Sequence, residues 1–181
     1  AVIYKQITYV QNRNVGYVRN NLVEHPTTGD IKKNYELIKN ELLSSGVATS
    51  VSKTSLSVTL DGNNGNGFNW GDMSPAHKEV TFSNFATTGD FVKTFGFKLL
   101  EGRDIDLKTY PSDSAAVLIN ESAAKAMGFK DPIGQTVKNG NMSMTIVGEI
   151  NNFIIGSPYT EVSPMVVYGS NHWWYNTITF R

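Results

Sequence analysis

Residues 115–128 read AAVLINESAAKAMG, and this stretch decides how the chain is expected to fold. Its first five residues form a short apolar run that predicts a buried β-strand. Asn120 follows directly, and asparagine commonly caps the N-terminus of a helix. We therefore expect a helix that ends at Gly128, because glycine favours the left-handed conformation found after the last helical turn. The inward face of that helix would carry Ala123, Ala124 and Met127.

A strand–helix–strand succession is also expected between residues 21 and 54. Residues 21–26 predict a short extended segment that Pro26 ends. A helix is then expected to begin at Asp30 as N-cap and to end near Gly46. Its apolar face lies at steps of four, three and four residues: Ile31, Tyr35, Ile38 and Leu42. Residues 47–54 alternate and predict a strand, so the whole segment indicates a βαβ unit.

Shorter patterns cover the rest of the chain. Residues 1–17 fit a helix and a strand equally well. Residues 61–72, DGNNGNGFNWGD, predict a cluster of turns, and a strand with Val80 and Phe82 on one face follows. Asp90 is expected to open a short helix on which Phe91 and Phe95 stack one turn apart.

The second half of the chain shows further turns and one longer strand. Gly102 is expected to adopt a positive φ. Arg103 and Asp104 follow it and are expected to clamp the loop ionically. Residues 131–134, DPIG, predict a turn, residues 143–150 predict a strand, and residues 151–164 predict a loop.

Composition excludes several classes of protein. The chain has 181 residues, of which 40% are hydrophobic, and its formal net charge is zero. That neutrality gives no electrostatic reason to expect a nucleic-acid partner. Absence of cysteine excludes disulfide and thiolate chemistry. The sequence opens on Ala1 and stops within a strand-like stretch, so we expect it to be excised from something longer.

Candidate metal and catalytic groups are scattered along the sequence. His25, His77 and His172 have no second ligand at helical spacing, so no metal site is predicted. In residues 61–72, Asp61 and Asn63 begin a calcium-loop pattern that glycines then interrupt. Four carboxylates near strand or helix ends leave a hydrolase pair open in principle: Asp104, Asp106, Glu121 and Glu149. No catalytic residue, cofactor or metal is therefore assigned, and the ligand-binding residues stay unknown.

Aromatic residues flanked by polar ones offer a different possibility. They are Phe68, Trp70, Trp173, Trp174 and Tyr175. Together they could form a recognition surface for a glycan or a peptide. Because strand side chains alternate between faces, we expect at least half of them to belong to the core instead.

A series of short sequence blocks resembles the pattern of a known family. In order, the blocks are GDF at 89–91, FGF at 95–97, LEGRD at 100–104, AVLINE at 116–121, DPIGQ at 131–135 and IVGEINNF at 146–153. Their order and spacing resemble the periplasmic core domain of MacB-like and FtsX-like permeases of ABC transporters, in the form common in Bacteroidetes. The helix and strand from Asp30 to Thr54 also fit the opening βαβ unit of that family.

The resemblance implies an α+β, two-lobed extracytoplasmic domain. Residues 1–59 would form the N-terminal segment and first βαβ lobe, and residues 60–170 a smaller, mixed α/β insertion lobe. Residues 171–181 would return as a strand of the first lobe, with the second βαβ unit truncated and one sheet edge left uncovered. The implied parent is a permease of the cell inner membrane with this segment facing the periplasm.

The resemblance also implies partners and a mode of action. Such permeases work as homodimers or heterodimers with a cytoplasmic ATPase and, in some systems, a periplasmic adaptor. ATP-driven conformational change would pass through this domain to export or envelope regulation, with no enzymatic step of its own. Two alternatives remain at this stage: a secreted or surface-anchored module that binds glycan or peptide, and a hydrolase.

Overall fold

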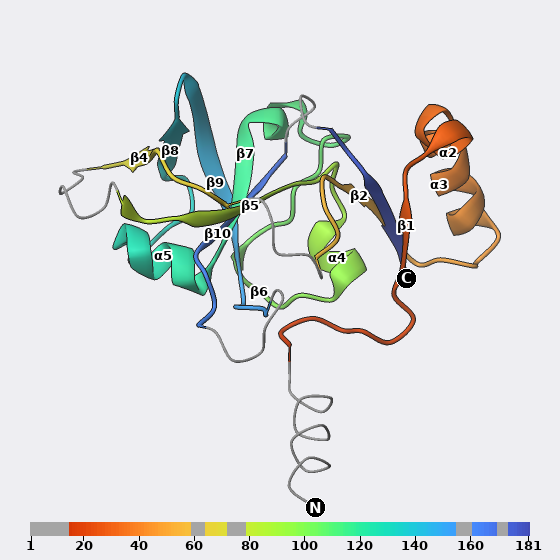
Figure 1. The fold of residues 1–181 in the computed structure, drawn as a ribbon, viewed down its shortest axis with the longest axis horizontal. Coiled ribbons are helices and arrows are strands. Elements are labelled where there is room, and N and C mark those ends of the chain that lie inside the picture. Colours follow the sequence, from red (N-terminus) through yellow and green to blue (C-terminus); the bar gives the residue numbers. More distant parts are fainter. Residues whose placement is uncertain (1–14, 59–63, 72–78, 155–160, 170–173) are drawn as a thin grey trace, which may run out of the picture.

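The computed structural model describes residues 15–58, 64–71, 79–154, 161–169 and 174–181. These residues build two β-sheets that lie side by side along the molecule, with short helices against them (Figure 1). The predicted α+β class is confirmed. Most of residues 1–17, which fitted a helix and a strand equally well, lie outside the described residues. The calcium-loop residues Asp61 and Asn63 lie outside them too.

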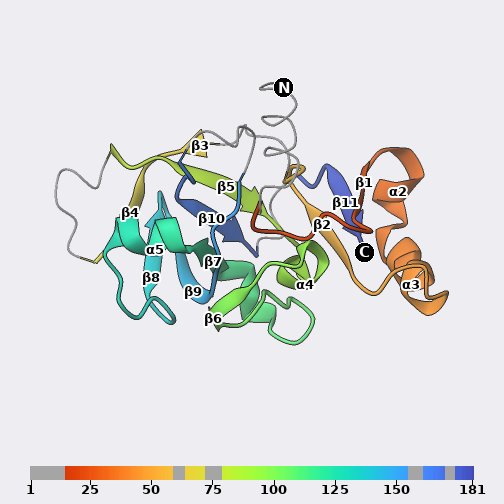
Figure 2. The ribbon, with the colours of Figure 1, turned by 90° about the horizontal axis from the view of Figure 1, so that it is seen from below.

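The smaller sheet has three strands, β1 (Val23–Pro26), β11 (Thr177–Phe180) and β2 (Val51–Thr54), in that spatial order. β11 is antiparallel to both neighbours, so β1 and β2 run in the same direction, as the βαβ prediction requires. The two strands do not touch, however, because the distant β11 lies between them. Helices α2 (Gly29–Lys33) and α3 (Tyr35–Ser44) lie on the outer side of this sheet (Figure 2).

The prediction of one helix starting at Asp30 is wrong in detail. Asn34 leaves the helical region with φ −112° and ψ 26°, so the segment divides into α2 and α3. Thr28, rather than Asp30, occupies the N-cap position, and Asp30 lies in the first turn. The expected apolar face is nevertheless correct. Tyr35 packs with Ala48, Val51 and Ile178, and Ile31, Ile38 and Leu42 lie against this cluster.

The larger sheet has eight strands. They are β3 (Asn64–Gly65), β4 (Phe68–Trp70), β5 (Phe82–Ala86), β6 (Leu99–Gly102), β7 (Ala116–Asn120), β8 (Thr136–Asn139), β9 (Met142–Ile150) and β10 (Met165–Tyr168). The spatial order is β3-β5-β10-β7-β9-β8-β4, with β6 paired to β9. The pairs β5–β10 and β7–β9 are parallel and the others are antiparallel, so the sheet is mixed.

The stretch around Asn120 folds as its sequence predicts. β7 leads directly into α5 (Glu121–Met127), and the Asn120 side chain accepts a hydrogen bond from the backbone N–H of Ala123 at 2.9 Å. Gly128 ends the helix in the left-handed conformation with φ 73°. Every residue of β7 is buried, which is typical of a central strand covered on both faces.

Two apolar clusters cover the two faces of the larger sheet. One contains Val117 and Ile119 of β7 together with residues of α5. The other contains Leu118 together with Phe91 and Phe95 of helix α4 (Phe91–Phe95). This division follows from the alternation of side chains along a strand. The predicted contact of Phe91 with Phe95 is confirmed, with ring centroids 5.0 Å apart.

Several strands lie where the sequence did not predict them. Residues 61–72 contain β3 and β4 instead of turns alone, and Phe68 and Trp70 of β4 are buried. Strands β6, β8 and β10 were also not predicted. Strand β2 begins at Val51, so residues 47–50 lie outside the expected strand. The division into lobes at 1–59, 60–170 and 171–181 stays a prediction.

Candidate functional site at the junction of the two sheets

The two sheets meet where β2 lies against the segment that follows β5. An isolated antiparallel bridge joins Thr54 to Thr87. Ser55 reinforces it, since its N–H donates to the Ala86 carbonyl at 3.0 Å and its Oγ accepts the Ala86 N–H at 2.9 Å. The Thr88 N–H donates to the Lys53 carbonyl at 3.1 Å. Backbone pairing therefore continues from the smaller sheet into the larger one.

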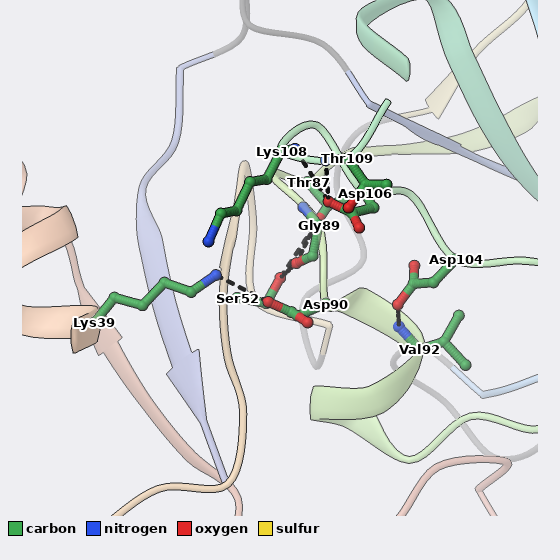
Figure 3. Close-up of polar contacts among 10 residues, drawn as sticks. All are labelled: Lys39, Ser52, Thr87, Gly89, Asp90, Val92, Asp104, Asp106, Lys108 and Thr109. Carbon is green, nitrogen blue, oxygen red and sulfur yellow. Dashed lines mark hydrogen bonds and ion pairs between the residues drawn. The ribbon is translucent and has the colours of Figure 1, made fainter. Parts of the chain in front are cut away.

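A closed ring of buried hydrogen bonds lies at the centre of this junction (Figure 3). The Ser52 Oγ donates to the Gly89 carbonyl at 2.8 Å and lies 3.0 Å from Thr87 Oγ1. The Gly89 N–H donates to the same Thr87 Oγ1 at 3.2 Å. Ser52 and Thr87 have no exposed surface, and Gly89 has a φ of 118°, which favours glycine. We call Ser52, Thr87 and Gly89 the junction ring.

Arg181 forms a second connection. Its guanidinium donates to the carbonyls of Thr94 in α4 at 2.8 Å, Val18 at 2.6 Å and Asn20 at 3.1 Å. Its backbone carbonyl accepts the Thr49 N–H at 2.5 Å. One side chain thus joins the end of β11 to the helix that covers the larger sheet.

A cavity of about 480 Å³ opens beside the junction ring. Helix α3 contributes Lys39 to its wall, and the segments around residues 88–93 and 103–110 contribute the rest. The Lys39 Nζ donates to Asp90 Oδ2 at 2.8 Å. Burial opposes the charge on Lys39, but the bond to Asp90 and nearby negative groups outweigh it and raise the pKa of Lys39.

Asp104 lies in the cavity wall and caps α4. Its two carboxyl oxygens accept the N–H groups of Val92 and Ile105, each at 2.8 Å (Figure 3 shows the first). Burial raises the pKa of Asp104 to about 7, although the backbone N–H groups favour the charged form. Asp104 is therefore a carboxyl group that changes charge near neutral pH.

Arg103 clamps the loop ionically, as predicted, but its partner is Asp113, and Asp104 takes no part in the ion pair. Arg103 instead donates from two guanidinium nitrogens to the two oxygens of Asp113, at 2.6 and 2.8 Å. The planar fork of arginine matches a carboxylate held side-on, whereas Asp104 is turned toward the N-terminus of α4. Burial favours a higher pKa for Asp113, but Arg103 and the Asp106 N–H outweigh it and lower that pKa.

Of the four carboxylates considered for a hydrolase pair, two line the cavity and two lie elsewhere. Asp104 and Asp106 both line it. The Asp106 Oδ1 accepts the N–H groups of Lys108 and Thr109, and bonds from Thr109 lower the pKa of Asp106. Glu121 accepts the Asn152 N–H at 2.8 Å. Burial raises the pKa of Glu149, and the negative charges of Glu121 and Glu101 raise it further.

The aromatic residues do not gather on one surface. Phe68 and Trp70 are buried in the core. Tyr175 packs partly against the same cluster, whereas Trp174 is 80% exposed. Trp173 lies outside the described residues.

The histidines considered as metal ligands form no metal site within the described ranges. His25 is exposed on β1, and His77 and His172 lie outside those ranges. Among the residues placed by the structure, no group of three His, Asp and Glu side chains is arranged to hold a metal ion. In the same part of the chain, no helix has the length and apolar character that a membrane crossing needs.

The profile of the family described as MacB-like periplasmic core domain matches residues 3–177, nearly the whole chain. The chain belongs to this family. The sequence-based resemblance is thereby confirmed for the family. No curated protein sequence gives a significant match to the chain.

Two solved structures share the fold of this MacB-like domain. The periplasmic region of MacB from Actinobacillus actinomycetemcomitans is 16% identical, with a TM-score of 0.56 over 94% of this chain and 78% of that one. The extracellular domain of the noncanonic ABC-type transporter YknZ from Gram-positive bacteria is 13% identical. Its TM-score is 0.53 over 88% of this chain and 81% of that one. At these identities the likeness concerns the fold.

Sequence reasoning missed the residues that join the two sheets of the MacB-like domain. Ser52, Thr87 and Lys39 are ordinary polar residues, and no local motif distinguishes them from surface positions. Gly89 is the first residue of the GDF block at 89–91, and Thr87 lies two positions before it, so this block was the nearest available signal. The structure gives that block its physical reason, because the Gly89 carbonyl and N–H both belong to the junction ring.

Proposed function

We propose that this MacB-like domain faces the periplasm as part of an inner-membrane ABC transporter permease. In this proposal it transmits ATP-driven conformational change to export or to envelope regulation, and it has no catalytic reaction of its own. The membership of the family over residues 3–177 carries the proposal. The partners would be a second permease subunit, in a homodimer or a heterodimer, and a cytoplasmic ATPase, with a periplasmic adaptor in some systems.

The junction supports a transmitting role. A force applied to the smaller sheet reaches the larger one through the Thr54–Thr87 bridge, the junction ring and Arg181. Buried hydrogen bonds break only at the cost of leaving unsatisfied polar groups, so small displacements are passed on rather than absorbed. The two sheets would therefore move as one body.

Distances between spin labels, measured by double electron–electron resonance on the full-length permease with its ATPase, test this proposal. The 181 residues contain no cysteine, so introduced cysteines are unique within the domain. A spin label at Lys138→Cys, on an exposed residue of β8, would be paired with a label on the second permease subunit. We expect the distance between subunits to differ between the nucleotide-free and ATP-trapped states. The same distance distribution in both states would contradict the proposal.

A second pair of labels examines the junction itself. Glu41→Cys on α3 and Lys138→Cys on β8 report the distance between the two sheets of one domain. This distance should stay constant across nucleotide states while the distance between subunits changes. Ser52→Ala removes two hydrogen bonds of the junction ring and should broaden the distribution, whereas Ser44→Ala on the exposed end of α3 should not.

A further inference from the structure

The cavity beside the junction ring is lined mainly by charged side chains. Its wall carries four basic and three acidic side chains: Lys39, Lys93, Arg103, Lys108, Asp90, Asp104 and Asp106. The cavity volume, about 480 Å³, lies within the range of small-molecule sites. The cavity therefore has the size and the polar groups of a binding site.

Pairing among these side chains leaves two lysines without an ionic partner. Lys39 is bound to Asp90, and Arg103 is bound to Asp113. In the described part of the chain, the ammonium groups of Lys93 and Lys108 have no hydrogen bond or ion pair. Figure 3 shows Lys108 extending toward the same region as Lys39, and both residues line the cavity.

The two other carboxylates of the wall are held by backbone N–H groups and not by the ammonium groups of these lysines. Asp106 is held by the N–H groups of Lys108 and Thr109, so its carboxylate is already occupied on one oxygen. Asp104 has both oxygens bound to N–H groups of the backbone, and its burial keeps part of the population protonated near pH 7. Neither carboxylate has an ion-pair contact with Lys93 or Lys108 within the described residues.

From these observations we infer that the cavity binds a small anion through a phosphate or carboxylate group. The ammonium groups of Lys93 and Lys108 would contact the anionic oxygens. Lys39 reaches the same cavity from α3, whereas the other basic residues come from segments attached to the larger sheet. A bound anion would consequently connect the two sheets beside the junction ring.

A titration of the ¹⁵N-labelled 181-residue chain tests the inference. The probes are inorganic phosphate and citrate, each added at constant ionic strength against sodium chloride. We expect saturable shifts of the amide signals of Thr88, Gly89 and Lys108 with at least one probe. Response to phosphate alone would assign a phosphoryl ligand and response to citrate alone a carboxylate ligand. The absence of a saturable response to both would overturn the inference.

Charge-matched variants separate the cavity from general surface attraction. The double change Lys93→Met and Lys108→Met should weaken binding roughly tenfold or more, because two charge-assisted contacts are lost. The control Lys33→Met and Lys138→Met removes the same charge from exposed positions outside the cavity and should leave the affinity unchanged. Equal affinities of the two double variants would also overturn the inference. The assay requires no ATP hydrolysis, so its failure leaves the proposed transmission intact.

Discussion

Replacing Asn120 by alanine should destabilise the domain strongly, because one buried side chain makes three hydrogen bonds. Its Oδ1 accepts the N–H groups of Ala123 and Met165, both at 2.9 Å, and its Nδ2 donates to the Ser163 carbonyl at 3.0 Å. Asn120 has no exposed surface, so water cannot replace these contacts. Each buried group left without a partner costs about 1–2 kcal/mol, and loss of the helix cap belongs to the same sum. We expect the free energy of unfolding to fall by about 3–5 kcal/mol.

Urea denaturation followed by circular dichroism measures this loss. In a chain of this size, the thermal midpoint should fall by about 10 °C, at roughly 2–4 °C per kcal/mol. The control is Asn69→Ala, since Asn69 is exposed and its side chain donates only to Gly67 at 3.2 Å. If Asn120→Ala costs less than about 1 kcal/mol, or no more than this control, the reasoning about buried unsatisfied groups is refuted.

Three further predictions follow from the core, the ion pair and the titrating carboxyl group. Gly148→Ala should cost about 2 kcal/mol or more in denaturation, because the new Cβ would meet a backbone carbonyl and lie 2.8 Å from Leu118 Cδ2; a cost no larger than that of Ser143→Ala, on the same strand, would contradict it. Arg103→Met should cost roughly 2 kcal/mol at neutral pH, since it leaves the buried Asp113 carboxylate without its cation. Because Arg103 lowers the pKa of Asp113, the deficit should shrink in acid, as that carboxylate protonates. Carbon-13 NMR should show the Asp104 carboxyl titrating with a midpoint of about 7. Because the folded state holds this proton more tightly, Asp104 should contribute stability at acid pH that is lost as the pH rises through 7, and Asp104→Asn should flatten this dependence. A midpoint near 4 would contradict the pH prediction.

Local signals in the sequence predicted the elements that depend on local physics. Asn120 and Gly128 mark the ends of α5 because capping involves only neighbouring residues. The apolar spacing of the helical segment predicted the packing of Tyr35 and its neighbours, although it could not show the interruption at Asn34. The backbone bonds on either side of Asn34 continue the helical pattern, so side-chain periodicity survives the break.

The missed strands are short and depend on distant partners. β6 and β10 have four residues each, too few to show a period, and both pair with strands far along the chain. β8 was accessible to sequence reasoning, because Gly140 and Asn141 form the kind of two-residue connection that joins hairpin strands. The mixed order of the larger sheet follows from tertiary packing and not from any single segment.

The site was less predictable than the fold for the same reason. Lys39 and Asp90 are 51 positions apart and meet only after both sheets have formed. Arg103 and Asp104 are adjacent in sequence, and this suggested a shared ionic role, but the Asp104 carboxyl is bound to the N–H groups of Val92 and Ile105. The true partner, Asp113, is brought close by the turn that follows Asp106. Charge pairing across loops cannot be deduced from charge order alone.

The central position of β11 in the smaller sheet has a consequence for biogenesis. Thr49 and Arg181, which are hydrogen-bonded across that sheet, are 132 positions apart. Ile178 of β11 completes the apolar cluster around Tyr35 and Val51. During synthesis and translocation from the N-terminus, those side chains emerge long before the strand that covers them. The apolar side chains of α3 and β2 are consequently exposed until β11 has been synthesised. During that time a chaperone that holds unfolded chains would bind to them.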